Sequence, residues 1–136
     1  MSTSSKTRLR FDRTEVEPEQ DTRRRIRVTL GLGELLFHAD AVDSADGSGP
    51  LKAAAEATLK AVQEAAAHKF TCVLSDLDHV NALGKELIAV LVDMNFESRD
   101  VQVFGSCQIA GSEIDCAVKA TLNATNRMFE LAMRGE

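Results

Sequence analysis

Apolar and polar residues alternate along several short stretches of the chain, and a two-residue period of this kind predicts β-strands. In the first such stretch, Ile26, Val28 and Leu30 alternate with polar side chains. The glycines at 31 and 33 are typical of a hairpin turn, and the alternation resumes over residues 34–42. This part of the sequence therefore predicts two strands joined by a tight turn.

Three more strands are predicted over residues 70–77, 86–93 and 101–109. The first alternates regularly, whereas the second is apolar along nearly its whole length, which is typical of a strand that is buried on both faces or lies at an interface. In the third, Gly105 indicates a bulge or the close approach of another backbone. Polar or turn-forming residues at 81–84 and 95–100 separate these strands.

Two further stretches have apolar residues at the spacing of an amphipathic helix. The first runs from Leu51 to about Ala67 and follows Pro50, which suits the first position of a helix because a backbone N–H has no helical partner there. The second follows Ser112, a preferred helix cap, with Asp115 placed to complete a capping box. The predicted order of elements is ββα followed by βββα.

The second helix repeats the first. Five residues recur with the same identity 63 positions later, where Ala54, Ala57, Thr58, Leu59 and Ala61 return as Ala117, Ala120, Thr121, Leu122 and Ala124. Such a duplication predicts two similar strand-and-helix units around a pseudo-twofold axis. We therefore expect an α+β fold in which both helices cover one face of a mostly antiparallel sheet.

Residues 1–23 lack a regular apolar pattern, and we expect them to form a disordered basic and polar arm, because they bury too little surface to offset the entropy of ordering. Residues 24–136 are expected to form a single α+β domain that contains the duplication. Residues 1–27 carry eight Lys or Arg and five Asp or Glu, although the whole chain has a net charge of −5. The domain is therefore acidic and should repel nucleic-acid phosphates.

Composition argues against several classes of protein. The chain has no Trp and no Tyr, which disfavours a stacking platform for single-stranded nucleic acid, and no apolar run is long enough to span a membrane. The N-terminus has no secretory signal, which favours the cytoplasm. The histidines are isolated in sequence, so no metal site or cofactor is expected. The three cysteines, Cys72, Cys107 and Cys116, are expected to be small buried hydrophobes.

The sheet face that the helices leave uncovered is expected to be apolar as well. It would be drawn partly from six apolar residues or from the residues that alternate with them, namely Leu36, Val42, Val73, Ile88, Val90 and Val92. A short protein with a face of this kind is expected to bury it against a second copy of itself. The sequence therefore predicts a homodimer.

Three stretches also resemble a known family. GSGPLKAAAEATLKAV, SDLDHVNALG and FGSCQIAGSEIDCAVKATLNATNR fall within residues 26–134 and are similar to the C-terminal regulatory and dimerisation domain of isopropylmalate and citramalate synthases. That domain has a Gly-x-Gly-Pro loop, as at residues 47–50, and a Lys-Ala…Asn-Ala-x-Asn-Arg string, as at residues 119–127. The resemblance implies a non-catalytic regulatory or dimerisation module that binds a small effector or a protein partner.

In that family, leucine or a related effector lies near the loops that precede the helices, at the dimer interface. The backbone N–H groups at a helix start carry partial positive charge, so they could bind the carboxylate of an amino acid or a short carboxylic acid. The predicted ligand-binding residues are Gly47, Ser48, Gly49, Pro50, Gly111, Ser112 and Glu113. The second loop departs from the family pattern, since residues 105–107 read Gly-Ser-Cys where Gly-x-Gly is usual.

Two other functions stay open on the sequence alone. Asp76, Asp78 and His79 could bind a cation or move a proton in a small enzyme with its site at a subunit interface, although Asp is also a common turn former. The basic arm, with arginines at 23–25, could instead serve a ribosome-associated or nucleic-acid-associated protein. Three polar residues of the second helix form either the hydrogen-bonding set of an interface or pocket or a solvated face, namely Asn123, Asn126 and Arg127.

Overall fold

The structure, a computed structural model, describes residues 8–19, 23–43 and 49–134. Its elements follow the chain in the order β1 (Arg10–Pro18), β2 (Arg24–Leu32), β3 (Leu35–Val42), α1 (Gly49–Ala65), β4 (Phe70–Ala82), β5 (Lys85–Phe96), β6 (Arg99–Gln108) and α2 (Glu113–Arg134). Each half of the chain is thus three strands followed by a helix. The predicted α+β class with antiparallel strands is confirmed.

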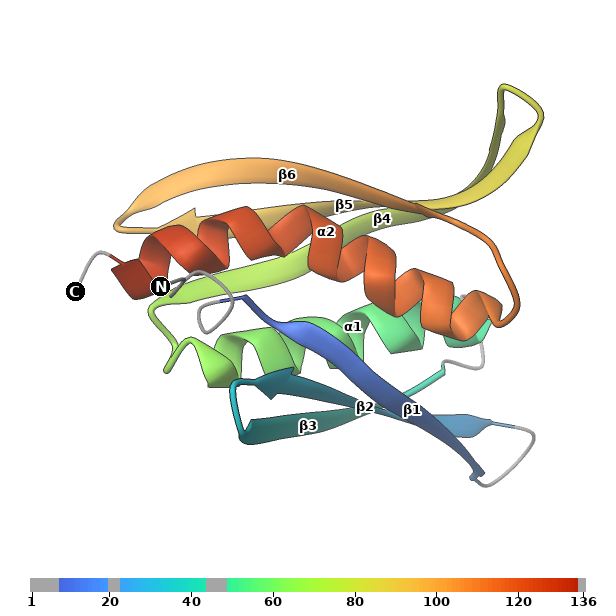
Figure 1. Cartoon of the computed structure of the whole chain (residues 1–136), viewed down its shortest axis with the longest axis horizontal. Coiled ribbons are helices and arrows are strands. Elements are labelled where there is room, and N and C mark those ends of the chain that lie inside the picture. The colour runs from blue at the N-terminus through green and yellow to red at the C-terminus, as the bar shows by residue number, and fades with distance from the viewer. Residues whose placement is uncertain (1–7, 20–22, 44–48, 135–136) are drawn as a thin grey trace.

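The strands form two separate three-stranded sheets, β1-β2-β3 and β4-β5-β6, in which every neighbouring pair is antiparallel. The helices lie side by side between the two sheets, as Figure 1 shows. Helix α1 packs on β2 and β3 of its own half and also on β4, whereas α2 packs on β5 and β6 and also on β1. Each helix therefore covers its own sheet and touches the first strand of the other.

The prediction of a disordered arm over residues 1–23 was wrong for Arg10–Pro18, which form β1. The strand was hard to recognise because its outward side chains are charged and a register shift between Phe11 and Arg13 interrupts the alternation. Leu9, just before it, is 2% exposed and belongs to the core. The first half is consequently βββα and not ββα.

With β1 included, a shift of 63 residues relates the whole of one half to the other. The shift carries β1 onto residues 73–81 within β4, and β2 onto residues 87–95 within β5. It carries β3 and α1 onto residues 98–105 and 112–128, which overlap β6 and α2. The duplication that was visible in the helices therefore extends to every element.

Side-chain amides tie each helix to the first strand of the other half. The Gln63 amide accepts a hydrogen bond from the Cys72 N–H at 3.3 Å and donates to the Cys72 carbonyl at 3.4 Å. The amide of Asn126, 63 positions later, accepts from the N–H of Leu9 and donates to its carbonyl, both at 3.2 Å. These equivalent pairs connect the two halves and explain how β1 is held in place.

One further contact ties each helix to the third strand of its own half, and only its donors correspond under the shift of 63, since position 40 corresponds to 103 and not to 106. The Lys60 ammonium donates to the carbonyl of Asp40 on β3 at 3.0 Å, and the Asn123 amide donates to the carbonyl of Ser106 on β6 at 2.7 Å. Both asparagines therefore hydrogen-bond to the main chain of their own domain, Asn126 from a buried position and Asn123 from an exposed one, whereas Arg127 is exposed. A role of these residues at an interface or in a pocket stays a prediction.

Small residues allow the helices to pack closely on the sheets. Alanines dominate the buried face of both helices, and Gly105 of β6 lies directly against α2. A Cβ atom at Gly105 would stand 2.3 Å from the carbonyl oxygen of Ala120 and 2.4 Å from the nitrogen of Ala124. The predicted close approach of another backbone at Gly105 is therefore confirmed, and the partner is the second helix.

Candidate functional site

The starts of α1 and α2 come together at one end of the molecule (Figure 1) and border a single cavity of about 510 Å³. Its lining residues are Gly49, Pro50, Leu51, Lys52, Leu77, Ser112, Glu113 and Ile114. Seven of these eight come from the two helix starts, and Leu77 comes from β4. The duplicated segments that the sequence singled out therefore share one hollow.

Of the seven predicted ligand-binding residues, the structure brings Gly49, Pro50, Ser112 and Glu113 together around the cavity. Gly47 and Ser48 lie outside the described residues, and Gly111 lies next to the cavity without lining it. The sequence missed four lining residues: Leu51, Lys52, Leu77 and Ile114. Three of them follow the predicted helix starts by one or two positions, whereas Leu77 could be found only from the packing of β4. Ligand binding by these residues stays a prediction.

The start of α2 is held firmly by local contacts. Gly111 has a φ of 89°, a left-handed conformation that glycine adopts without strain and that turns the chain into the helix. The Ser112 hydroxyl then accepts a hydrogen bond from the N–H of Asp115 at 3.1 Å, which confirms the predicted cap. Thr14 of β1 donates its hydroxyl proton to the Asp115 carboxylate at 2.7 Å. One wall of the cavity is therefore pre-formed.

The chemistry of the cavity is mixed. Leu51, Leu77 and Ile114 supply apolar walls, while Lys52 and Glu113 supply one charge of each sign. The first helical N–H groups of both helices also lack carbonyl partners within their own helices, and they favour anionic groups. An aliphatic molecule that carries both a carboxylate and an ammonium group matches this set of lining groups.

The Asp76, Asp78 and His79 cluster is not assembled as a site. Neighbouring residues on a strand point to opposite faces, so the His79 ring and the Asp78 carboxylate diverge from β4. The His79 Nε2 atom lies 3.7 Å from Glu86 Oε1 on β5, and both side chains are largely exposed. Within residues 8–19, 23–43 and 49–134, no group of three or more His, Cys, Asp or Glu residues is placed to hold a metal ion.

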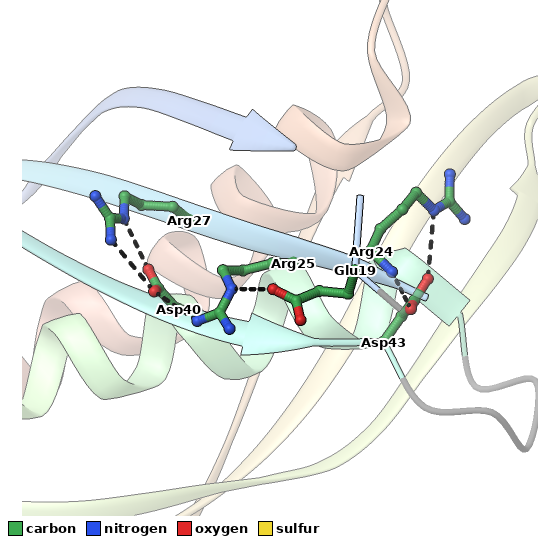
Figure 2. A network of polar contacts seen from close by, with 6 residues as sticks. All are labelled: Glu19, Arg24, Arg25, Arg27, Asp40 and Asp43. Carbon is green, nitrogen blue, oxygen red and sulfur yellow. Dashed lines mark hydrogen bonds and ion pairs between the residues drawn. The ribbon is translucent and has the colours of Figure 1, made fainter. Parts of the chain in front are cut away.

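The arginines at the start of β2 are engaged in ion pairs, as Figure 2 shows. Arg25 donates to Glu19 at 2.6 Å and Arg27 donates to Asp40 at 2.8 Å. Arg24 lies 3.4 Å from the buried carboxylate of Asp43. The hydrogen bond from Arg27 is the main reason why the pKa of Asp40 lies below its ordinary value. These cations are therefore neutralised within the domain and do not form a free basic arm.

The cysteine prediction holds for two residues of three. Cys72 and Cys116 are buried, whereas Cys107 is half-buried. Burial raises the pKa of the Cys72 thiol to about 12 and that of the Cys116 thiol to about 11, with a further rise at Cys116 from the adjacent Cys107. Because a thiol with such a pKa is almost fully protonated at pH 7, neither Cys72 nor Cys116 is an activated nucleophile.

The outer face of the β4–β6 sheet carries apolar side chains, but several of the residues predicted for it lie on the inner face. Ile88, Val90 and Val92 point inward against the helices and are at most 1% exposed. The predicted Val73 does lie on the outer face, together with Phe104, and these side chains are 66% and 64% exposed. Leu36 and Val42 belong to β3 of the other sheet. A shallow cavity of about 240 Å³ lies on this face, lined in part by Val80, Ala89, Leu91 and Phe104.

A scan against models of protein families finds no match to this chain, and a search of curated proteins also returns none. Among the described residues, no helix is both long enough and apolar enough to cross a membrane.

Proposed function

We propose that this chain is a non-catalytic regulatory and dimerisation module that binds a small amphoteric effector, an amino acid or a short carboxylic acid, in the cavity between the two helix starts. The observation that carries the proposal is the convergence of both helix starts on one cavity of about 510 Å³. A volume in this range suits a small molecule. The resemblance to the regulatory domain of isopropylmalate and citramalate synthases points to the same kind of ligand.

The lining groups indicate how the effector would bind. A carboxylate would be attracted by Lys52 and by the N–H groups at the helix starts, and an ammonium group would be attracted by Glu113. Leu51, Leu77 and Ile114 would bury a branched aliphatic side chain. A branched-chain amino acid therefore satisfies every group that lines the cavity, while a short carboxylic acid leaves Glu113 without a partner.

The proposed dimer uses the outer face of the β4–β6 sheet and a second copy of this chain. Three strands about 4.8 Å apart and roughly ten residues long, at about 3.3 Å per residue, present a projected face on the order of 500 Å². Side chains that protrude from the sheet add to this area, which approaches the ~800 Å² per partner of a stable interface. Phe104 and Leu91 would lie near the centre of the interface, with Asp76 and Asp78 at the rim on the edge strand β4.

Calorimetric titration and thermal-shift measurements test the effector proposal. Leucine, isoleucine, valine and short aliphatic acids are titrated into the full chain, and at 100 times Kd a ligand should stabilise the fold by about 2.7 kcal/mol. Lys52→Ala should weaken binding of a carboxylate roughly tenfold, by loss of about 1.4 kcal/mol. Lys85→Ala, at the tip of the β4–β5 hairpin, is the matched control. Absence of any shift across the panel at millimolar concentration would exclude the effector.

Light scattering coupled to size exclusion tests the dimer. The wild-type chain should elute as a dimer at micromolar concentration, and Phe104→Glu should convert it into a monomer of about 15 kDa with an unchanged fold. Leu36→Glu, at a 48% exposed apolar residue on the outer face of the other sheet, is the control and should stay dimeric. A monomeric wild-type chain would remove this part of the proposal, and a dimer unaffected by Phe104→Glu would place the interface elsewhere.

A further inference from the structure

Two of the three cysteines lie next to each other where β6 leads into α2. Cys107 stands near the end of β6, and Cys116 follows it by nine positions, in the first turns of the helix. The Cys116 thiol donates to the main-chain carbonyl of Cys107, with 3.1 Å between Sγ and oxygen. The Cys107 thiol also contacts Cys116 and contributes to the raised pKa of that residue. The two side chains thus point into the same space between sheet and helix.

The third cysteine provides an internal comparison. Cys72 is buried between β4 and α1, and its sulfur lies 3.9 Å from the main-chain carbonyl of Leu59. Its surroundings contain no second thiol that contacts it, and its pKa is raised by burial alone. All three cysteines have free thiols in this structure. Among the three cysteines, therefore, the residues at 107 and 116 are the two that lie next to each other.

We propose that Cys107 and Cys116 form a dithiol modification site, which a low-molecular-weight disulfide such as glutathione disulfide converts into an intramolecular disulfide bond. A disulfide needs two Cβ atoms roughly 3.8 Å apart, with side chains directed at each other. The Cys116 sulfur lies 3.1 Å from the main-chain carbonyl oxygen of Cys107, so the two residues are direct neighbours. The Cys107 sulfur lies 3.6 Å from the carbonyl oxygen of Gln108, and its side chain must rotate toward Cys116 before the sulfurs can join.

The reaction proceeds by two thiol–disulfide exchanges. The half-buried Cys107 loses its proton to solvent, and the thiolate attacks one sulfur of glutathione disulfide. The S–S bond of the oxidant breaks, one glutathione thiolate leaves, and a mixed disulfide remains on Cys107. The Cys116 thiolate then attacks the Cys107 sulfur and releases the second glutathione. Two protein thiols lose two electrons, and one glutathione disulfide is reduced to two glutathione molecules.

The bond would close a loop that carries part of the candidate cavity. The segment between the two cysteines contains Gly111, Ser112 and Glu113, and the last two of these line the cavity. Oxidation would fix this loop covalently to β6 and would therefore restrict the wall that Glu113 supplies. The effect on a ligand rests on the proposed function, whereas formation of the disulfide does not.

The experiment exposes the full-length protein to glutathione disulfide, traps free thiols with an alkylating agent and maps the products by mass spectrometry. We expect loss of two hydrogens and a cross-linked peptide pair that contains Cys107 and Cys116. The melting temperature of the oxidised protein should rise by roughly 5–10 °C, because a loop of about ten residues is closed in the unfolded chain. Cys72→Ser should behave as the wild type.

Variants at the pair separate the two steps. Cys116→Ala should stop at a glutathione adduct on Cys107, and Cys107→Ser should give neither the adduct nor the cross-link. In the wild type, the second step should accelerate about tenfold per pH unit between pH 7 and 10, since the pKa of Cys116 is about 11. A stable glutathione adduct on Cys107 of the folded wild type, or a cross-link that includes Cys72, would overturn the proposal. Both results are read without any effector, so they are independent of the proposed function.

Discussion

The outer faces of the two sheets differ although the sheets are copies of one design. On β1–β3, Arg25 and Arg27 pair with Glu19 and Asp40, and the Arg10 guanidinium lies over Gly31. On β4–β6, the corresponding surface presents Val73 and Phe104, which are 66% and 64% exposed, whereas the apolar residues on the outer face of β1–β3, Leu36 and Val42, are 48% and 38% exposed. Charged side chains that pair with one another satisfy a solvent-facing sheet, while an exposed apolar face is a common mark of an interaction surface. One copy of the design therefore carries paired charges beside its exposed apolar residues, and the other presents the more exposed apolar side chains.

The buried contacts of the two halves are, by contrast, nearly the same. Thr58 donates its hydroxyl proton to the carbonyl of Ala54 at 2.7 Å, and Thr121 donates to that of Ala117 at 2.8 Å. The amides of Gln63 and Asn126 repeat the same two-point contact with a strand of the other half. The two copies therefore share the hydrogen bonds that join the halves, whereas the side chains on their outer faces differ. Four pairs of substitutions test this division, from the largest expected effect to the smallest.

The largest effect is expected at the strand glycines. Gly105→Ala would place a methyl group 2.3–2.4 Å from the backbone of α2, which cannot move away locally, so we expect a loss of about 3 kcal/mol or more in the free energy of unfolding. Gly31→Ala meets only the end of the flexible Arg10 side chain, at 2.5 Å, and should cost under about 1 kcal/mol. Urea unfolding of both variants measures the difference. Equal losses would contradict the direct strand-to-helix contact in the second half.

The second largest effect is expected for the side-chain amides of Asn126 and Gln63. Asn126→Ala would leave the buried N–H and carbonyl of Leu9 without partners, at a cost of about 2–3 kcal/mol. Gln63→Ala removes longer bonds at a half-buried position, and about 1 kcal/mol is expected. Hydrogen exchange provides a local measurement, because β1 should lose protection in the first variant and β4 in the second. Loss of protection in both strands in either variant would show that the two contacts do not act independently.

The elements that could be predicted from the sequence differ from the one that could not in how regular their apolar pattern is. The strands β2 to β6 and both helices were predictable because their apolar residues recur at strand or helix spacing or form a continuous apolar run, although the turn between β5 and β6, at Glu97 and Ser98, contains neither glycine nor proline. Strand β1 was not, since its charged outer face resembles a solvated arm and its burial depends on Asn126, more than a hundred residues away. The 63-residue shift could have predicted β1, because it relates residues 73–81 of β4 to residues 10–18.

The candidate site shows a similar limit. Both helix starts were recognised from loops and caps, which are local features of the chain. Their meeting at one cavity, and the contribution of Leu77, depend on how α1 and α2 pack against each other and on β4. The seven predicted residues therefore identified the two segments, but the apolar walls required the tertiary structure. Asp76, Asp78 and His79 are close in sequence but do not form one site, because neighbouring residues on a strand point to opposite faces.

The helix starts offer the third test. Helix α2 has a serine cap and two acidic residues in its first turn, Glu113 and Asp115, whereas α1 has no acidic residue there. Ser112→Ala should cost about 1 kcal/mol through the lost bond to the Asp115 N–H. Ser106→Ala is the control, since the main-chain carbonyl of Ser106, and not its hydroxyl, accepts the bond from Asn123. Chemical denaturation should register a loss for the first variant alone, and a loss of equal size in the control would show that the cap contributes nothing.

The smallest effect concerns the ion pairs on the outer face of β1–β3. Hydrogen bonds from Arg27 and Arg25 lower the pKa of Asp40, so its carboxylate favours the folded state above the ordinary pKa of the group, near 3.8. That contribution must be lost as the pH falls through the lower folded value. Asp40→Asn should therefore be slightly less stable than the wild type at pH 7, and the gap should close on acidification. Because the partners are solvent-exposed, the gap should also shrink in high salt.

Asp93→Asn is the matched variant on the other sheet, since the Asp93 carboxylate accepts its hydrogen bond from the neutral amide of Gln102 at 2.7 Å. Melting temperatures of both variants from pH 7 to pH 3, at low and high salt, separate the two faces. A salt-dependent and pH-dependent gap at Asp40 alone is expected if the first sheet owes its solvated face to charge pairing. The same dependence at Asp93 would mean that the pairing around Asp40 has no special role, and the contrast between the faces would then rest on the apolar side chains alone.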